Sequence, residues 1–469
     1  MAEEKSKADE LKEKLFHKRE NAAKKLTQPE IAEADAFCEG YKDFLNRAKT
    51  EREAASFMEV RAKAHGFAEF DPKKAYAAGD KVYYNNRGKA VILAVIGEKP
   101  LEAGLRLTAA HIDSPRLDLK PSPLYEDAGL ALFKTHYYGG IKKYQWTCLP
   151  LALHGVMVKK DGEKIEVRIG EEADEPRFAV TDLLPHLANE QMKRTLADGV
   201  RGEELNVLVG SRPFSADESS DQVKLNILNI LFEKYGVTES DFLSAELEIV
   251  PAYPACDIGF DRSMIGSYGH DDRVCAYPAA EAIFALEGTP AYTAVTVLTD
   301  KEEIGSEGNT GLNSAYLEHF ITDLCLSRGE NVRTALHHTK SLSADVTAAF
   351  DPTYPDVCER NNAAFLNGGA AFMKYSGARG KSGTSDASAE YMAAVRRMLD
   401  ENGVVWQCAE LGKVDAGGGG TVAMFLAGMD IDVVDIGVPV LSMHAPFEIV
   451  SKLDVFMTYR ACKAFFEEK

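Results

Sequence analysis

The chain has 469 residues, of which 45% are hydrophobic and 27% charged, an ordinary composition for a soluble globular protein of about two domains. Its formal net charge of −19 repels nucleic acid and anionic membranes, so we expect neither as a partner. No apolar run approaches the roughly 20 residues that cross a bilayer. Residues 1–25 form a charged helical pattern rather than a secretion signal, so we expect a cytoplasmic protein.

The N-terminal part, residues 1–114, is expected to form the first part of a catalytic domain. Helical patterns cover about 4–66, where Ala, Glu, Lys and Leu dominate. Three strand patterns follow, at 81–86, 89–96 and 106–112. The third strand delivers His111 at its carboxyl end, where open α/β sheets place their ligands.

The middle part, residues 115–254, is expected to be an inserted, mainly β domain. Its strand patterns lie close together without long helices between them, at 131–138, 151–158 and 164–169. A helix is predicted over 222–235. The proline-rich turn at 251–254 then returns the chain to the first domain.

The C-terminal part, residues 255–469, alternates strands with helices. Helices are predicted over 273–286, 312–326, 386–400, 421–427 and at the C-terminus. Strands are predicted over 293–298, 340–345, 371–375, 404–408 and 432–436. This alternation predicts an α/β fold, with a three-layer α/β/α catalytic domain around a mixed, mostly parallel sheet.

Five short motifs offer the nitrogen and oxygen ligands that a pair of divalent cations needs for hydrolysis. They are Ala110-His111-Ile112-Asp113-Ser114-Pro115, Gly269-His270-Asp271-Asp272-Arg273, Thr299-Asp300-Lys301-Glu302-Glu303-Ile304-Gly305, Ser343-Ala344-Asp345 and Ser442-Met443-His444-Ala445-Pro446. Each motif alone is also explained by ordinary structure. Together they point to one site, because we expect all five at the strand ends of one sheet.

The residue types suggest how such a site works. His111 and Asp113 lie on the same face of an extended segment, so the imidazole can bind a metal and the carboxylate can orient it. Asp271 begins a helix pattern, where it either caps the helix or bridges two cations. His270 is expected to be a bystander, and Asp272 and Arg273 to support Asp271.

The adjacent carboxylates of Glu302 and Glu303 follow an apolar strand and are poorly explained by packing. One can bind metal while the other stays free to take a proton, although an exposed acidic turn is the structural alternative. Asp345 and His444 would supply the terminal ligands of the two ions.

A run of four glycines, 417–420, precedes a helix pattern. It lacks the lysine of a phosphate-binding loop and the spacing of a dinucleotide fingerprint. We expect Gly418 and Gly419 to let the backbone approach a substrate near the metals, and a plain flexible turn is the alternative.

The order of these motifs resembles the aspartyl aminopeptidase family of di-zinc exopeptidases. The matching stretches span nearly the whole chain: 110–120, Tyr138-Gly139-Gly140, 184–188, 271–273, 302–306, 343–345, 367–374 and 442–444. By position, the resemblance implies that His111 and Asp345 bind one metal and Glu303 and His444 the other. It also implies that Asp271 bridges the two ions, that Glu302 is the general base and that Asp113 orients His111.

The resemblance carries further expectations about assembly. Residues 115–254 would form a dimerisation domain, and His186 would reach toward the active site of a neighbouring subunit. Family members assemble from such contacts into hollow dodecamers that admit peptides and exclude folded proteins.

The sequence departs from the family at the position expected to select acidic substrates. Acidic-selective members carry a histidine where this chain has Asp351, whose charge would repel a substrate's Asp or Glu. Lys374 would offset this charge if it faced the pocket, and is otherwise a surface lysine. We therefore expect a broader or neutral preference.

The resulting hypothesis is a metal-dependent aminopeptidase that removes the N-terminal residue of peptides. It would use two Zn²⁺ per subunit, with Co²⁺ or Mn²⁺ as alternatives, a bridging water and a glutamate base. One rival is a di-metal deacylase acting on small N-acyl substrates. The other is a non-enzymatic, shell-like assembly.

Overall fold

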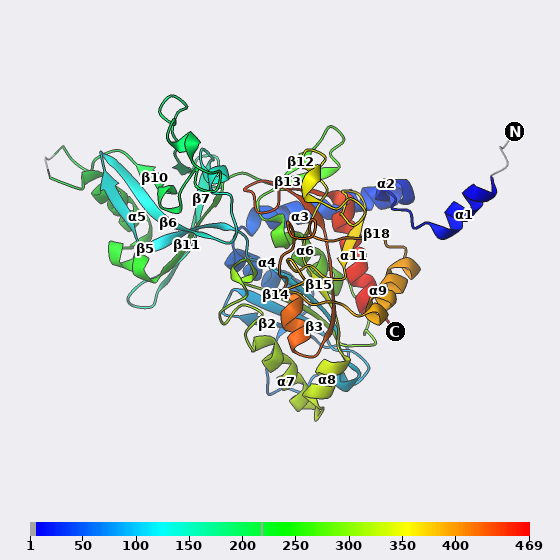
Figure 1. Ribbon diagram of the computed structural model, residues 1–469. Coiled ribbons are helices and arrows are strands. Elements are labelled where there is room, and N and C mark those ends of the chain that lie inside the picture. The colour runs from blue at the N-terminus through cyan, green and yellow to red at the C-terminus, as the bar shows by residue number, and fades with distance from the viewer. Residues whose placement is uncertain (1–5, 217–218) are drawn as a thin grey trace.

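The structure is a computed structural model that describes residues 6–216 and 219–469. It has a mixed α/β fold whose strands form three sheets of nine, seven and five strands. Figure 1 shows the seven-stranded sheet in a separate lobe, to the left of a body that holds the other two. We call this part, from β5 to β11 (116–251), the β lobe. Within the described residues, no helix is long and apolar enough to cross a membrane.

The N-terminal helical pattern divides into four helices. Residues 4 and 5 of the predicted 4–66 region lie outside the described residues. The remainder forms α1 (Lys7–Leu15), α2 (Ala22–Lys25), α3 (Gln28–Arg47) and α4 (Glu51–Ala64). Thr27 and Glu30 form a capping box at the start of α3, as expected from a Thr-x-x-Glu sequence.

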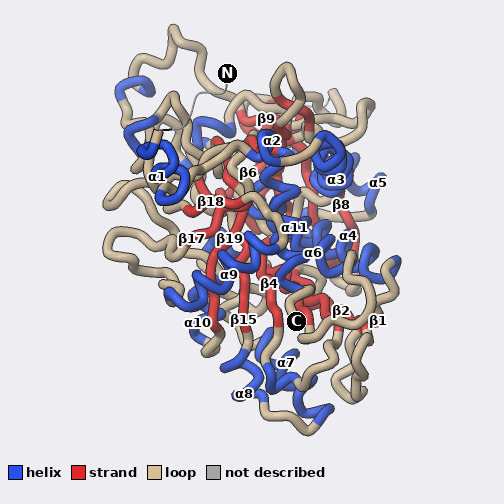
Figure 2. The backbone as a smooth tube through the Cα atoms, turned by 90° about the vertical axis from the view of Figure 1, so that its right-hand side faces the viewer, coloured by secondary structure: helices blue, strands red, loops and turns tan. Residues whose placement is uncertain are grey.

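The nine-stranded sheet is mixed and carries the strand ends that matter for function. In spatial order its strands are β1 (Ala68–Glu69), β2 (Lys81–Asn86), β3 (Ala90–Val95), β14 (Ala294–Thr299), β4 (Arg106–His111), β15 (Lys340–Ala344), β19 (Asp432–Gly437), β17 (Ala370–Met373) and β18 (Trp406–Cys408). The central strands β14, β4, β15 and β19 are parallel neighbours. Figure 2 shows β4, β15 and β19 side by side. Their register places Thr299 opposite His111, so the carboxyl ends of these strands meet at one edge.

Both faces of this sheet are covered, which explains its almost continuously apolar strands. Alternate residues of β3 enter two different cores: Val91 and Leu93 lie in one, Ile92 and Ala94 in the other. The first core is completed by α3, α4, α6 (His270–Phe284), α9 (Ala389–Glu401) and α11 (Lys452–Phe466). The second is completed by α7 (Tyr316–Arg328), α8 (Val332–His338) and α10 (Ala423–Gly428).

The β lobe has its own sheet and its own apolar core, which includes Phe133 and Trp146. The strands in spatial order are β8 (Lys164–Ile169), β7 (Leu151–Val158), β11 (Ala245–Pro251), β5 (Arg116–Asp127), β6 (Leu130–Tyr138), β10 (Val207–Gly210) and β9 (Ala179–Val180). Helix α5 (Gln222–Tyr235) packs against this sheet. The sequence did not predict β5, because two prolines interrupt its alternation and the register shifts between Leu119 and Leu124.

The five-stranded sheet was also not predicted, since its strands are too short to show a period of two. It comprises β12 (Cys256–Ile258), β13 (Met264–Ser267), β21 (Glu448–Ser451), β20 (Pro439–Leu441) and β16 (Thr347–Ala348). Asp271 follows β13, and His444 lies in the turn between β20 and β21. The expectation that all five motifs end strands of one sheet is therefore wrong, because two sheets supply them.

Candidate metal centre

Three of the five motifs reach the centre from parallel strands. His111 is the last residue of β4, Asp345 directly follows β15, and Glu302 and Glu303 begin a short turn after β14. Because these strands are neighbours in the sheet, their carboxyl ends bring the three motifs together.

Asp271 is held by a compact arrangement at the start of α6. Its backbone carbonyl accepts a hydrogen bond from the Ser114 hydroxyl at 2.6 Å, and Ser114 accepts one from Arg273 at 2.9 Å. Arg273 is fully buried and also donates to the Gly269 carbonyl. A side chain at Gly269 would collide with this guanidinium at 1.7 Å, and Gly269 has φ +74°, so only glycine fits there. The peptide between Asp271 and Asp272 is cis.

The Asp271 carboxylate lies between two imidazoles. His111 Nε2 is 3.1 Å from one of its oxygens, and His444 Nε2 is 3.0 Å from the other. Two ligand groups share this carboxylate: His111, Asp271 and Asp345, and Asp271, Glu303 and His444, each with atoms within 4.8 Å of one another. Ligands about 2 Å from one tetrahedral zinc are about 3.3 Å apart, so these spacings suit an ion in each group.

Both histidines present the same nitrogen to the centre. His111 Nδ1 lies 3.0 Å from the Asp113 backbone carbonyl and 3.3 Å from its carboxylate. His444 Nδ1 lies 2.7 Å from the Gly140 carbonyl. A carbonyl can only accept, so each Nδ1 carries a proton, and Nε2 is the nitrogen that can bind a metal when the ring is neutral. The two rings differ in access, since the His111 side chain is 1% exposed and that of His444 34%.

Asp113 fixes the turn that carries the two glutamates. Its carboxylate accepts hydrogen bonds from the backbone N–H groups of Glu302 and Glu303, both at 3.2 Å. The Tyr138 hydroxyl donates a further bond at 2.8 Å. This fully buried carboxylate therefore lies beside the His111 ring and holds the backbone of the turn that carries both glutamates.

Negative charge exceeds positive charge at the centre. The buried or largely buried carboxylates are Asp113, Asp271, Asp272, Glu302, Glu303, Asp345 and Glu448. Arg273 donates to neutral oxygens, and among the described residues the cationic groups within 4 Å of Asp271, Glu302 and Glu303 are the two imidazoles. Burying unpaired carboxylates costs several kcal/mol each, so such a cluster calls for bound cations. Within the described chain, Glu303 Oε1 is buried without a hydrogen-bond partner, as expected of a metal ligand.

The pKa values set by the protein's own groups follow this charge pattern. Burial raises the pKa of Glu303 and of Asp345 well above the usual carboxyl range, and neighbouring carboxylates add to it. For Asp271, burial is outweighed by His111 and His444, which lower its pKa. Glu303 and Asp345 would therefore be neutralised by protons unless bound cations took the place of those protons.

Glu302 has the environment of a general base. Its carboxylate lies 3.7 Å from His111 Nε2, and its side chain remains 18% exposed. Burial raises its pKa to about 7; His111 opposes this shift, and Asp271 and Asp113 add to it. A carboxylate with a pKa near neutrality can take up and return a proton during turnover.

One buried group was missed by the sequence analysis. The Glu448 carboxylate accepts hydrogen bonds from the backbone N–H of Asp271 at 3.1 Å and of His444 at 2.7 Å. It thereby joins the two motifs that the five-stranded sheet supplies. Burial raises its pKa to about 8, and Asp271 adds to the shift. The only signal in the sequence was a carboxylate four residues after His444.

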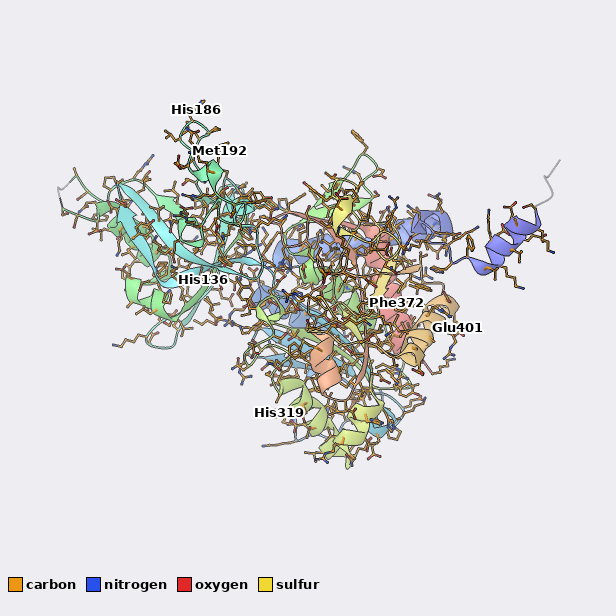
Figure 3. The ribbon with its side chains drawn as sticks, viewed as in Figure 1. His136, His186, Met192, His319, Phe372 and Glu401 are labelled. Carbon is orange, nitrogen blue, oxygen red and sulfur yellow. The ribbon has the colours of Figure 1, made fainter. Side chains whose placement is uncertain are left out.

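The predicted substrate residues have the following exposure and local contacts. His186 is exposed in a loop at the outer end of the β lobe (Figure 3). Lys374 pairs with Asp386 at 2.5 Å, and the half-buried Asp351 accepts a bond from the Thr353 N–H. Gly418 and Gly419 donate from their backbones to Leu411 and Ser376. His270 is turned toward Tyr41 and Ile265.

Comparisons with known proteins point the same way as this geometry. A family model described as aminopeptidase I zinc metalloprotease (M18) matches residues 44–466. A Clostridium acetobutylicum protein named probable M18 family aminopeptidase 1 is 49% identical over 459 residues, covering 96% of this chain and 98% of its own. The crystal structure of an M18-family aminopeptidase from Thermotoga maritima matches with a TM-score of 0.91 at 44% identity, covering 97% of this chain and 100% of that chain.

A more distant structure shares the fold alone. The mApe1 dodecamer of S. cerevisiae matches with a TM-score of 0.75 at 21% identity, covering 93% of this chain and 97% of that chain.

Proposed function

Because the chain belongs to the M18 family of zinc metalloproteases and is a zinc aminopeptidase, we propose that it holds two zinc ions per subunit to remove the N-terminal residue of peptides. The observation that carries this proposal is the position of Asp271, with one imidazole nitrogen about 3 Å from each carboxylate oxygen.

The ligand groups assign the ions. His111 and Asp345 would hold one zinc, Glu303 and His444 the other, and Asp271 would bridge them. The two nitrogen and several oxygen ligands would also accept Co²⁺ or Mn²⁺.

Glu302 and Asp113 would have different roles in hydrolysis. When bound, zinc would act as a Lewis acid that polarises the scissile carbonyl and would lower the pKa of water toward 7. Glu302 takes a proton from the attacking water and returns it to the leaving amine. Asp113 keeps Glu302 in place through the backbone bond described above.

A substrate panel tests this function against its rivals. Aminoacyl substrates with a free amine should be cleaved, whereas matched N-acyl substrates should not. Cleavage of the N-acyl set alone would favour the deacylase. A protein that binds zinc but cleaves neither set would favour the shell-like assembly.

We further propose that residues 1–114 and 255–469 form a three-layer catalytic domain, with residues 115–254 inserted as a dimerisation domain. The separate core of the β lobe supports the insertion, and the two cores on either face of the nine-stranded sheet support the three layers.

Exposed apolar side chains lie on α5 and in the loop that carries His186: Leu225, Ile230, Phe232, Leu183, Leu184, Leu187, Met192 and Leu196. Such patches are typical of protein interfaces. Dimers would build a dodecamer like that of the yeast relative.

Replacing Phe232 by glutamate should break this assembly. Phe232 is 56% exposed on α5, and a charge placed there would be desolvated at an apolar interface. Light scattering should report a smaller particle, while Leu326→Glu, at an exposed position on α7, should leave the mass unchanged. An unaltered mass for the Phe232 variant would exclude α5 from the interface.

We also propose a residue preference broader than Asp and Glu. The support is the negative charge of Asp351, where acidic-selective members resembling this chain carry histidine. The proposal would place His186, Lys374, Gly418 and Gly419 with Asp351 around the substrate. Turnover across a library of N-terminal residues tests it, and strict selectivity for Asp and Glu would refute it.

A further inference from the structure

We propose that Tyr138, Gly139 and Gly140, where β6 leaves the β lobe, form a positioning segment for both metal sites. This inference rests on the proposed two-metal centre. It assigns the β lobe a role in building the active site, separate from any role in assembly.

Tyr138 acts on the metal site of His111 through Asp113. Its ring is buried, and its hydroxyl donates to Asp113 Oδ2 at 2.8 Å. The same oxygen accepts the Glu303 N–H. The Tyr138 hydroxyl therefore helps to fix the carboxylate that orients His111 and holds the glutamate turn.

The two glycines act on the metal site of Glu303 and His444. The Gly140 carbonyl accepts the Nδ1–H bond that sets the tautomer of His444. Gly139 lies against Glu303: a Cβ there would come within 3.1 Å of Glu303 Oε2 and 3.3 Å of its Cβ. Three consecutive residues thus contact a supporting carboxylate, one carboxylate ligand and one histidine ligand.

The segment is itself anchored at the junction between lobe and body. The Arg116 guanidinium stacks over the Tyr138 ring at 3.9 Å. Arg116 also pairs with Glu51 of α4 at 3.4 Å and with Glu248 of β11 at 3.2 Å. Any displacement of the lobe relative to α4 would therefore move Tyr138 and disturb Asp113.

The alternative is that Tyr138 is only a packed aromatic residue whose hydroxyl needs a partner. The two explanations differ in what Tyr138→Phe changes. This variant keeps the ring and removes the bond to Asp113. A packing role predicts unchanged metal binding. A positioning role predicts weaker binding, because groups that orient metal ligands contribute about 10–100-fold in affinity.

The experiment measures zinc affinity by competition with a chelator, and the absorption spectrum of the Co²⁺-substituted protein. Tyr138→Phe should bind zinc about 10–100-fold more weakly and alter the cobalt spectrum. Tyr137→Phe, at an exposed neighbouring position, is the control and should match the unmodified protein. Unchanged affinity and spectrum in Tyr138→Phe would overturn the role of the hydroxyl.

A pair of glycine variants tests the metal site of Glu303 and His444 independently. This test also holds if Tyr138→Phe does not fold. Gly139 and Gly129 have similar positive φ values, +74° and +76°, but a Cβ at Gly129 meets nothing within 4 Å. Gly139→Ala should lose the zinc next to Glu303 while Gly129→Ala retains both. Equal zinc content in the two variants would overturn the role of Gly139. A single zinc in the unmodified protein would instead refute the two-metal proposal.

Discussion

Replacing Glu302 by glutamine is expected to lower kcat by about 10²–10⁴-fold, the usual contribution of a positioned general base. This corresponds to about 3–5 kcal/mol of activation free energy. The amide has nearly the same shape as the carboxylate but cannot take a proton from water. The backbone N–H of residue 302 would still donate to Asp113, so the turn that carries Glu303 should keep its place.

The control for this experiment is the zinc content of the same variant. Two ions per subunit and an unchanged unfolding temperature would show that the loss belongs to proton transfer. Turnover close to that of the unmodified protein would remove Glu302 from the mechanism. A loss of zinc together with activity would mean that Glu302 is a ligand.

Replacing Asp271 by asparagine should remove activity through loss of metal. Asp271 is the one residue shared by both ligand groups, and its two oxygens face different imidazoles. An amide offers one oxygen and no charge, so both ions should be held much more weakly. We expect zinc to fall from two ions per subunit toward none, with kcat falling to background.

The matched control is Asp345→Asn, because Asp345 belongs to one ligand group only. It should lose the ion next to His111 and keep the one next to His444. Retention of both ions in the Asp271 variant would contradict the bridging assignment. Loss of both ions in each variant would show that the two sites bind cooperatively.

Local sequence patterns predicted several residues of the candidate metal centre. The strand pattern over 106–112 placed His111 at a carboxyl end, and the structure has His111 as the last residue of β4. The adjacent Glu302 and Glu303 stood out because two carboxylates after an apolar strand have no packing role. Such signals are readable because each depends on fewer than ten consecutive residues.

Other contacts could not be read because they depend on how distant segments dock. Glu448 binds the Asp271 N–H across 177 positions of sequence, and no local pattern encodes that hydrogen bond. The strands β13, β20 and β21, which bring Asp271 and His444 to the centre, are only three or four residues long. Because these strands are too short to be predicted, we wrongly expected one sheet to supply all five motifs.

The unequal exposure of the two imidazoles should make the two metal positions exchange their ions at different rates. An ion beside the 34% exposed His444 would exchange with bulk solution, whereas an ion beside the 1% exposed His111 would be enclosed by protein. Under metal scarcity the molecule should therefore empty in sequence, passing through a half-loaded form. Whichever divalent cation is abundant in the surroundings would then refill the outer position first.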